Sequence, residues 1–203
     1  MPTLKLFLKA RTDKVPDDVL HSAGMKLREY FVSIYRKQSP GSSPDVLFKV
    51  NPSPGEIGEK DLLVYITEGN SYIIHELDRL DPGPAHELPP GHNGGGTKKM
   101  LNGEVLSEVP WTGGLAFSGV GRAQALANLI FHEWVHNKYA NDARALGMGE
   151  VNGAYVHTQC GGGVLAAELS YFTAARSTIN EDNRAAMLRV IDRANKQYTA
   201  GLT

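Results

Sequence analysis

The spacing of apolar and polar positions predicts an α+β protein with most of its strands in the N-terminal half. Residues 4–10 alternate apolar and polar side chains, which is the period of a half-buried strand. Residues 19–37 repeat apolar side chains at helical spacing, and Pro16-Asp17-Asp18 directly before them is a typical helix start. The predicted buried stripe of this helix consists of Leu20, Met25, Leu27, Phe31 and Ile34.

Short runs of β-branched and aromatic residues predict further strands of the same sheet. After the turn-forming residues 39–44, such runs occupy residues 46–50, 62–66 and 72–74. Residues 114–120 predict one more strand, placed at the edge of the sheet.

The composition changes to proline, glycine and polar residues over residues 78–113, which include PPGHNGGG at 89–96. Compact domains seldom leave such a length without regular structure unless it has a purpose. We therefore expect a loop that is either disordered or forms the rim of a functional site. Its histidines, His86 and His92, are interpreted as solvated loop residues.

Helices are predicted for the C-terminal part of the chain. Residues 122–136 are rich in Ala, Leu and Gln, which favour helix. After three glycines at 161–163, residues 164–176 and 181–197 predict two terminal helices. A capping box of Thr178 with Glu181 is expected to open the second one.

Length and charge favour one ordinary domain over residues 1–203 and exclude several classes of partner. There are 21 Lys and Arg against 22 Asp and Glu, without a long run of either sign, so nucleic acid is not an expected partner. No apolar stretch approaches the roughly 20 residues that span a bilayer. The alternation over the first strand also lacks the apolar core of a signal peptide, so a soluble protein is expected, cytoplasmic or exported by a signal-independent route.

Cys160 is the only cysteine, which excludes an internal disulfide and a four-cysteine zinc site. Any metal ion would therefore need histidine and carboxylate ligands. We interpret Cys160 as a small, partly buried thiol and not as a nucleophile paired with His157.

The chemistry is carried by His132-Glu133-Trp134-Val135-His136, a His-Glu-x-x-His motif inside the predicted helix 122–136. At 3.6 residues per turn the two imidazoles project from one face, one turn apart, and can grip one ion. Zn²⁺ suits such ligands, and a third protein ligand leaves one position for water. Glu133 follows the first histidine directly, within reach of that water, and is the predicted general base. The alternative is a solvated helix face with no metal.

At this motif the chain resembles the zincin metallopeptidases. The resemblance implies a small twisted mixed sheet with an N-terminal helix, an active-site helix and a C-terminal part that supplies the third zinc ligand. The predicted order of elements over residues 1–145 is similar to that of the family. Only residues 132–136 match the family motif itself.

The third ligand stays open between two subgroups of that family. The metzincin pattern aligns Asp142 with the third ligand and Tyr139 with a glycine that lets the chain turn, so Tyr139 departs from the pattern. The thermolysin-like pattern places the ligand about twenty residues after the second histidine. His157 falls 21 residues after His136, although that subgroup uses a glutamate there.

We rank His157 first and Asp142 second, with Glu150 and Glu168 as further candidates, while His157 is also compatible with a purely structural role. A phenolic hydroxyl could stabilise an oxyanion in such a site, and Tyr155 is the chosen candidate, with Tyr139 as the alternative.

The expected function is zinc-dependent hydrolysis of peptide bonds in a peptide or protein substrate, which could pair with the strand predicted at 114–120. One alternative is a zinc hydrolase acting on a non-peptide amide or a cell-wall fragment. Another is a metal-stabilised binding module without turnover, which four protein ligands on one ion would favour. A small hydrolase without a visible signal is also compatible with a toxin or effector domain.

Overall fold

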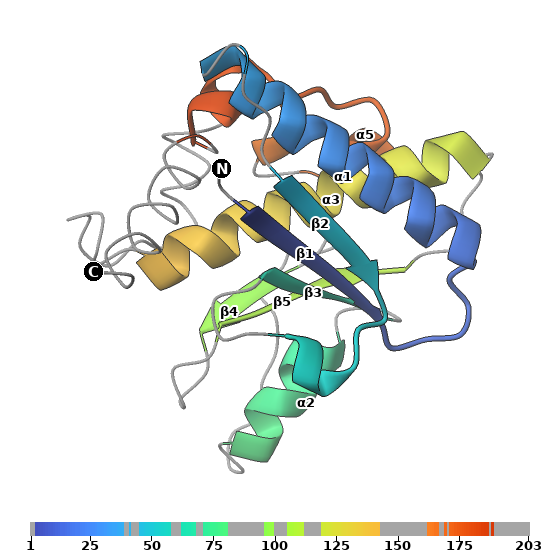
Figure 1. Cartoon of the computed structure of the whole chain (residues 1–203). Helices are drawn as coiled ribbons and strands as arrows, with labels where there is room; N and C mark the ends of the chain where they lie inside the picture. The colour runs from blue at the N-terminus through green and yellow to red at the C-terminus, as the bar shows by residue number, and fades with distance from the viewer. Residues whose placement is uncertain are drawn as a thin grey trace.

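The structure is a computed structural model, and Figure 1 shows its arrangement. The residues that it describes are 3–38, 41, 45–57, 62–67, 71–80, 96–99, 105–111, 119–142, 162–166, 169, 171–186 and 188.

A five-stranded mixed sheet forms the centre of the fold, in the order β2-β1-β3-β5-β4. Its strands are β1 (Thr3–Ala10), β2 (Asp45–Val50), β3 (Leu62–Thr67), β4 (Gly96–Lys99) and β5 (Val105–Pro110). The pairs β1–β2, β1–β3 and β3–β5 are parallel, whereas β4 pairs antiparallel with β5 and forms one edge. The expected α+β class with a mixed sheet is confirmed at this level.

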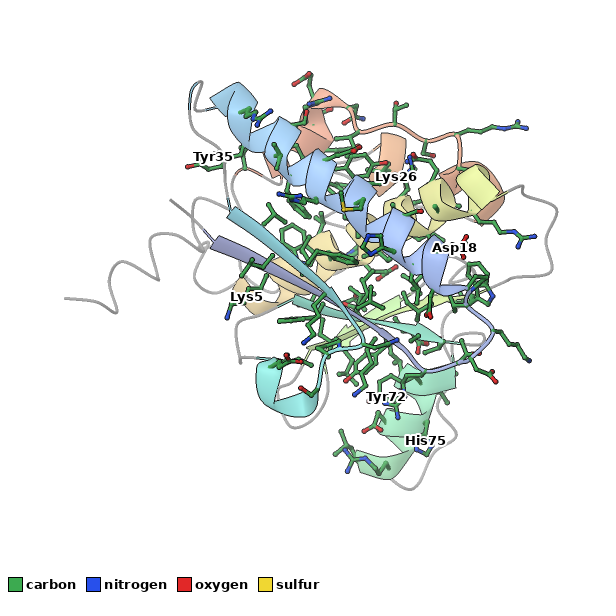
Figure 2. All side chains as sticks on the ribbon, turned by 45° about the vertical axis from the view of Figure 1, so that its right-hand side comes forward. Lys5, Asp18, Lys26, Tyr35, Tyr72 and His75 are labelled. Atoms are coloured by element: carbon green, nitrogen blue, oxygen red, sulfur yellow. The ribbon has the colours of Figure 1, made fainter. Side chains whose placement is uncertain are left out.

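Helices cover both faces of the sheet (Figure 1). On one face lie α1 (Asp17–Gln38) and α3 (Gly119–Asp142), which pack against each other, and on the other face lies α2 (Ser71–Leu80). Figure 2 shows the same separation, with Tyr72 and His75 of α2 below the sheet and Lys26 of α1 above it.

Besides the helical residues 181–186, the described part contains three short helical segments. They are the 3₁₀ turns at Pro54–Glu56 and Gly163–Leu165 and the single helical turn α5 (Tyr171–Ala174). None of the described helices combines the length and the apolar character needed to cross a membrane.

The main core lies between the sheet and the α1–α3 pair. Phe31 of α1 packs against Trp134 of α3 with ring centroids 4.7 Å apart, and Phe131 lies beside both. From Ala125 to Val135 every side chain of α3 is buried, because α1, the sheet, α5 and the 163–165 turn surround this helix. The His-Glu-x-x-His motif of the sequence therefore lies on the central helix of the molecule.

The strands predicted at 4–10, 46–50 and 62–66 and the helices predicted at 19–37 and 122–136 are confirmed. Within α1 the predicted buried stripe holds except at Met25, which is 39% exposed. Met25 lies about 160° around the helix from Leu27, outside the arc that faces the sheet and α3.

The strand predicted at 72–74 is wrong, because these residues belong to α2. Ile73 is fully buried against Leu106 of β5, and Tyr72 and Leu80 pack on the same small cluster. The helix can begin here because the Glu108 carboxylate accepts hydrogen bonds from the Tyr72 and Ile73 N–H groups. That partner lies more than 30 residues away, so the local pattern could not show it.

The irregular loop predicted at 78–113 is also wrong, since this range contains the end of α2 and both β4 and β5. The strand β5 was missed because Ser107 and Glu108 are polar residues at its centre, yet both are fully buried. Of the edge strand predicted at 114–120, residues 119 and 120 are helical in α3, and the other positions lie outside the described residues.

The C-terminal region differs from its prediction as well. Residues 164–176 do not form one helix, because the chain follows a 3₁₀ turn, becomes extended at Ala166 and is helical again only in α5. The segment that follows is helical over residues 181–186, and the rest of the predicted helix to 197 lies largely outside the described residues.

The N-terminal cap of residues 181–186 is formed by two asparagines and not by Thr178 with Glu181. The Asn183 N–H donates to Asn180 Oδ1 at 2.8 Å, and the Asn180 N–H donates to Asn183 Oδ1 at 3.2 Å. Short amide side chains satisfy the same orphan N–H groups as a Ser/Thr and Glu pair.

Candidate functional site

The helix α3 carries two adjacent polar stripes near its centre. His132 and His136 are one turn apart on the first stripe, and Glu133 and Asn137 are one turn apart on the second. His132, Glu133 and Asn137 are each less than 8% exposed, and His136 is half-buried. The first stripe meets the turn at 163–165, and the second meets β4 and β5.

The imidazole of His132 has a defined tautomer. Its Nδ1 lies 2.8 Å from the carbonyl oxygen of Val164, and a carbonyl can only accept a hydrogen bond. Nδ1 therefore carries the hydrogen in the neutral ring, and the lone pair is on Nε2. That Nε2 lies 3.1 Å from His136 Nε2.

The distance between the two imidazole Nε2 atoms of His132 and His136 can be compared with that of two ligands on one tetrahedral ion. Nitrogen atoms bound at 2.0 to 2.1 Å with a tetrahedral angle lie about 3.3 Å apart. The distance of 3.1 Å between the two Nε2 atoms is close to that value. Among the residues that the structure describes, no group of three His, Cys, Asp or Glu gathers as a metal site needs.

The candidates for a third ligand and for an oxyanion donor fall largely outside the described residues. These are His157, Glu150, Glu168 and Tyr155. For Asp142 and Tyr139 the backbone alone is described, and both belong to α3. The helix thus continues through Tyr139 without the turn that the metzincin alignment needs. Position 142 lies about 120° around the helix from His136.

Glu133 is held by a hydroxyl group of the edge strand. Thr97 Oγ1 lies 2.7 Å from Glu133 Oε2 and 3.1 Å from the Glu133 carbonyl oxygen. Thr97 pairs with Ser107 across β4 and β5, and their hydroxyl oxygens are 2.8 Å apart. Asn137 Nδ2 donates to Ser107 Oγ at 3.0 Å.

These contacts form a chain with one direction when Glu133 is ionised. The Asn137 amide nitrogen can only donate, so Ser107 Oγ accepts from it. The Ser107 hydrogen then goes to Thr97 Oγ1, its nearest acceptor, and the Thr97 hydrogen goes to Glu133 Oε2. Each group stabilises the next, and the chain ends on the carboxylate.

Two buried carboxyl groups near α3 have raised pKa values. The pKa of Glu133 is raised to about 8, mainly by burial; the Thr97 hydrogen bond acts to lower it, and the charge of Glu108 acts to raise it. Burial also raises the pKa of Glu108 to about 7, opposed by hydrogen bonds from the Ile73 and Tyr72 N–H groups and from Thr67. The pKa values of both carboxyl groups therefore lie near neutral pH.

Sequence reasoning proposed His132, Glu133 and His136 as site residues and did not propose Thr97, Ser107 and Asn137. Asn137 carries a local signal, since it follows Glu133 by four residues and shares its face. Thr97 and Ser107 carry none, because both lay in the segment that was predicted as a loop.

Comparisons with known proteins give no relative: no family model matches the chain, and neither the curated proteins nor the solved structures contain a match.

Proposed function

We propose that the protein is a zinc-dependent metallopeptidase that hydrolyses peptide bonds. The observation that carries the proposal is the pair of facing Nε2 atoms of His132 and His136, 3.1 Å apart, beside the buried carboxyl group of Glu133. A helical histidine pair with an adjacent carboxyl group suits metal binding and proton transfer together.

In this proposal His132 and His136 are zinc ligands, and His157 is the third, with Asp142 as the alternative. The continuation of α3 through residue 142 supports this ranking, because position 142 lies about 120° around the helix from His136. A bound zinc ion would supply Lewis acidity, polarising the scissile carbonyl and lowering the pKa of a water molecule.

Glu133 is the proposed general base. Thr97 occupies Oε2, so Oε1 is the atom proposed to take a proton from water and return it to the leaving amine. Its raised pKa suits a group that accepts and releases a proton near neutral pH. Tyr155 is proposed to donate a hydrogen bond to the developing oxyanion.

The first test is zinc content by elemental analysis of purified wild type, His132→Ala and His157→Ala. His75→Ala is the matched control, because His75 is exposed on α2, on the opposite side of the sheet from α3 (Figure 2). We expect about one zinc per chain in wild type and His75→Ala, as one site with three protein ligands implies, and none in the other two variants. If zinc were lost in His132→Ala but kept in His157→Ala, Asp142 would become the proposed third ligand in place of His157. A wild type without zinc would overturn the proposal.

The second test is turnover of Glu133→Gln. Casein and a mixed peptide library are incubated with each variant, and new termini are identified by mass spectrometry. We expect Glu133→Gln to keep its zinc and to lose about 10²- to 10⁴-fold in rate, because the amide cannot accept the proton. Full turnover in this variant would remove Glu133 from the mechanism. Zinc without cleavage of any peptide would contradict the peptidase assignment.

A further inference from the structure

We propose that Asn183 is a positioning residue for His132, acting through the glycine turn at 162–164. The inference rests on the proposed zinc site, and it extends that site to the C-terminal helical segment. The link is the Val164 carbonyl group, whose place Asn183 fixes.

Hydrogen bonds hold the turn at residues 162–164 in place, and Asn183 makes one of them. Asn183 is completely buried, and its Nδ2 donates to the Gly162 carbonyl oxygen at 3.1 Å. The Val164 N–H donates to the Thr178 carbonyl oxygen at 3.2 Å. The carbonyl of Val164 then accepts from His132 Nδ1 at 2.8 Å. Three consecutive residues are thus held at both ends and present one acceptor to the histidine.

The turn has little conformational freedom. Gly162 and Gly163 have φ values of 80° and 54°, which side chains other than glycine rarely adopt. A Cβ atom at Gly163 would lie 2.3 Å from the Thr178 carbonyl oxygen and 2.8 Å from Asn183 Oδ1. The turn is therefore seated directly on the cap of residues 181–186, and movement of the cap moves Val164.

The side-chain amide of Asn183 makes two different contacts. Asn183 Oδ1 accepts from the Asn180 N–H and caps the helical segment, while Nδ2 holds Gly162. An aspartate at position 183 would keep the acceptor and lose the donor. It would also place a carboxylate oxygen against the Gly162 carbonyl, where two acceptors repel.

The position of the Val164 carbonyl group determines the orientation and the tautomer of His132. A ligating histidine needs its second nitrogen hydrogen-bonded so that the ring orientation and the tautomer are fixed. With Val164 in place, Nδ1 carries the hydrogen and Nε2 faces His136. A displaced Val164 would let the hydrogen occupy Nε2, and zinc binding would then require a change of tautomer.

The test compares Asn183→Asp with Asn180→Asp. The control makes the same amide-to-acid change in the same cap, and its remaining oxygen still accepts the Asn183 N–H. Zinc affinity is measured by competition with a chromophoric chelator, using the metal alone. We expect Asn183→Asp to bind zinc about tenfold more weakly than wild type, at the low end of the effects of outer-shell changes. Asn180→Asp is expected to stay within about twofold of wild type on the same reasoning.

A second readout needs no metal. Long-range ¹H–¹⁵N NMR spectra of the metal-free protein report which nitrogen of His132 carries the hydrogen. We expect the Nδ1–H form in wild type and Asn180→Asp, and a mixture of both tautomers in Asn183→Asp. If Asn183→Asp does not fold, Gly162→Ala replaces it, because the alanine strains the turn at φ 80° while Asn183 stays intact.

The two proposals fail in different ways. Wild-type zinc affinity together with an unchanged tautomer in Asn183→Asp or Gly162→Ala would overturn the role of Asn183 and leave the zinc site in place. No zinc in wild type would overturn the proposed function, and the tautomer comparison would still decide whether Asn183 positions His132.

Discussion

Glu133 keeps its carboxyl group in a buried position because hydrogen bonds replace part of the water that it loses. The donor is Thr97, whose own oxygen is supported by Ser107. The hydrogen bond from Thr97 favours the ionised carboxylate and lowers the pKa of Glu133. Burial disfavours the ionised form and has the larger effect, so the pKa of Glu133 is raised overall. A single hydroxyl group on the edge strand thus adjusts the proposed general base.

Substitutions at Thr97 test whether its hydroxyl group supports Glu133. Thr97→Val keeps the shape of the side chain but removes the donor to Glu133 Oε2, whereas Thr97→Ser keeps the hydroxyl group. We expect Thr97→Val to retain zinc and to lose about 10- to 100-fold in kcat, which is less than the 10²- to 10⁴-fold that proton transfer as a whole contributes. Thr97→Ser should recover most of the rate. Initial rates on the peptide cleaved by wild type measure both, and equal rates for valine and serine would contradict the role.

The strand β5 places polar groups on both of its faces. Ser107 points to α3 and belongs to the Glu133 network, and Glu108 points to α2 and caps that helix. Among the described residues, Glu108 Oε1 has no hydrogen-bond partner although it is buried. A protonated carboxyl group would leave that oxygen uncharged, which agrees with the raised pKa of Glu108.

The prediction for this element is a dependence of stability on pH. The pKa of Glu108 is raised from 4.5 to about 7 in the folded protein, so its contribution is complete below pH 4.5. It is lost as the pH rises through 7, because the unfolded state has then released its proton while the folded state still holds one. Each pH unit between these values costs about 1.4 kcal/mol of unfolding free energy at most.

Glu108→Gln removes this titration and keeps an oxygen for the two N–H groups of α2. Urea unfolding of the metal-free protein at several pH values from 4.5 to 8 measures the effect. We expect stability to fall less steeply with pH in Glu108→Gln, while the contribution of Glu133 stays in both proteins. Parallel profiles would show that Glu108 does not titrate in this range.

The candidate site joins segments that lie far apart between residues 97 and 183. Thr97 and Ser107 come from the sheet, His132 to Asn137 from α3, and Val164 from the turn held by Asn183. The helix α3 is the common member, and it is buried between α1, the sheet and α5. Stability of the core and geometry of the site are therefore linked through one helix.

The whole-molecule prediction is that zinc stabilises the folded protein. An ion that binds only the folded state adds about 4 kcal/mol at a concentration 1,000 times its Kd. For a domain of about 200 residues this corresponds to a rise of roughly 8 to 16 °C in Tm. Thermal unfolding with added zinc and after chelation measures the shift. His132→Ala should show no shift, and an equal shift in that variant would place the ion elsewhere.

The sequence by itself determined the elements whose periodicity is local. The strands β1, β2 and β3 and the helices α1 and α3 follow from apolar spacing, because each buries one face or is apolar on nearly all sides. The placement of His132 and His136 on one face of α3 follows from helix geometry alone. These residues could be named without any knowledge of what surrounds them.

Only the tertiary structure decided the remainder of the site. Ser107 and Glu108 are polar residues inside a strand, and burial is tolerated there because partners come from α3 and α2. Likewise α2 could be a helix because Glu108 caps it, and the glycine turn could fix His132 because Asn183 holds it. Such partners lie tens of residues apart, so the hydrogen bonds exist only once the chain has folded.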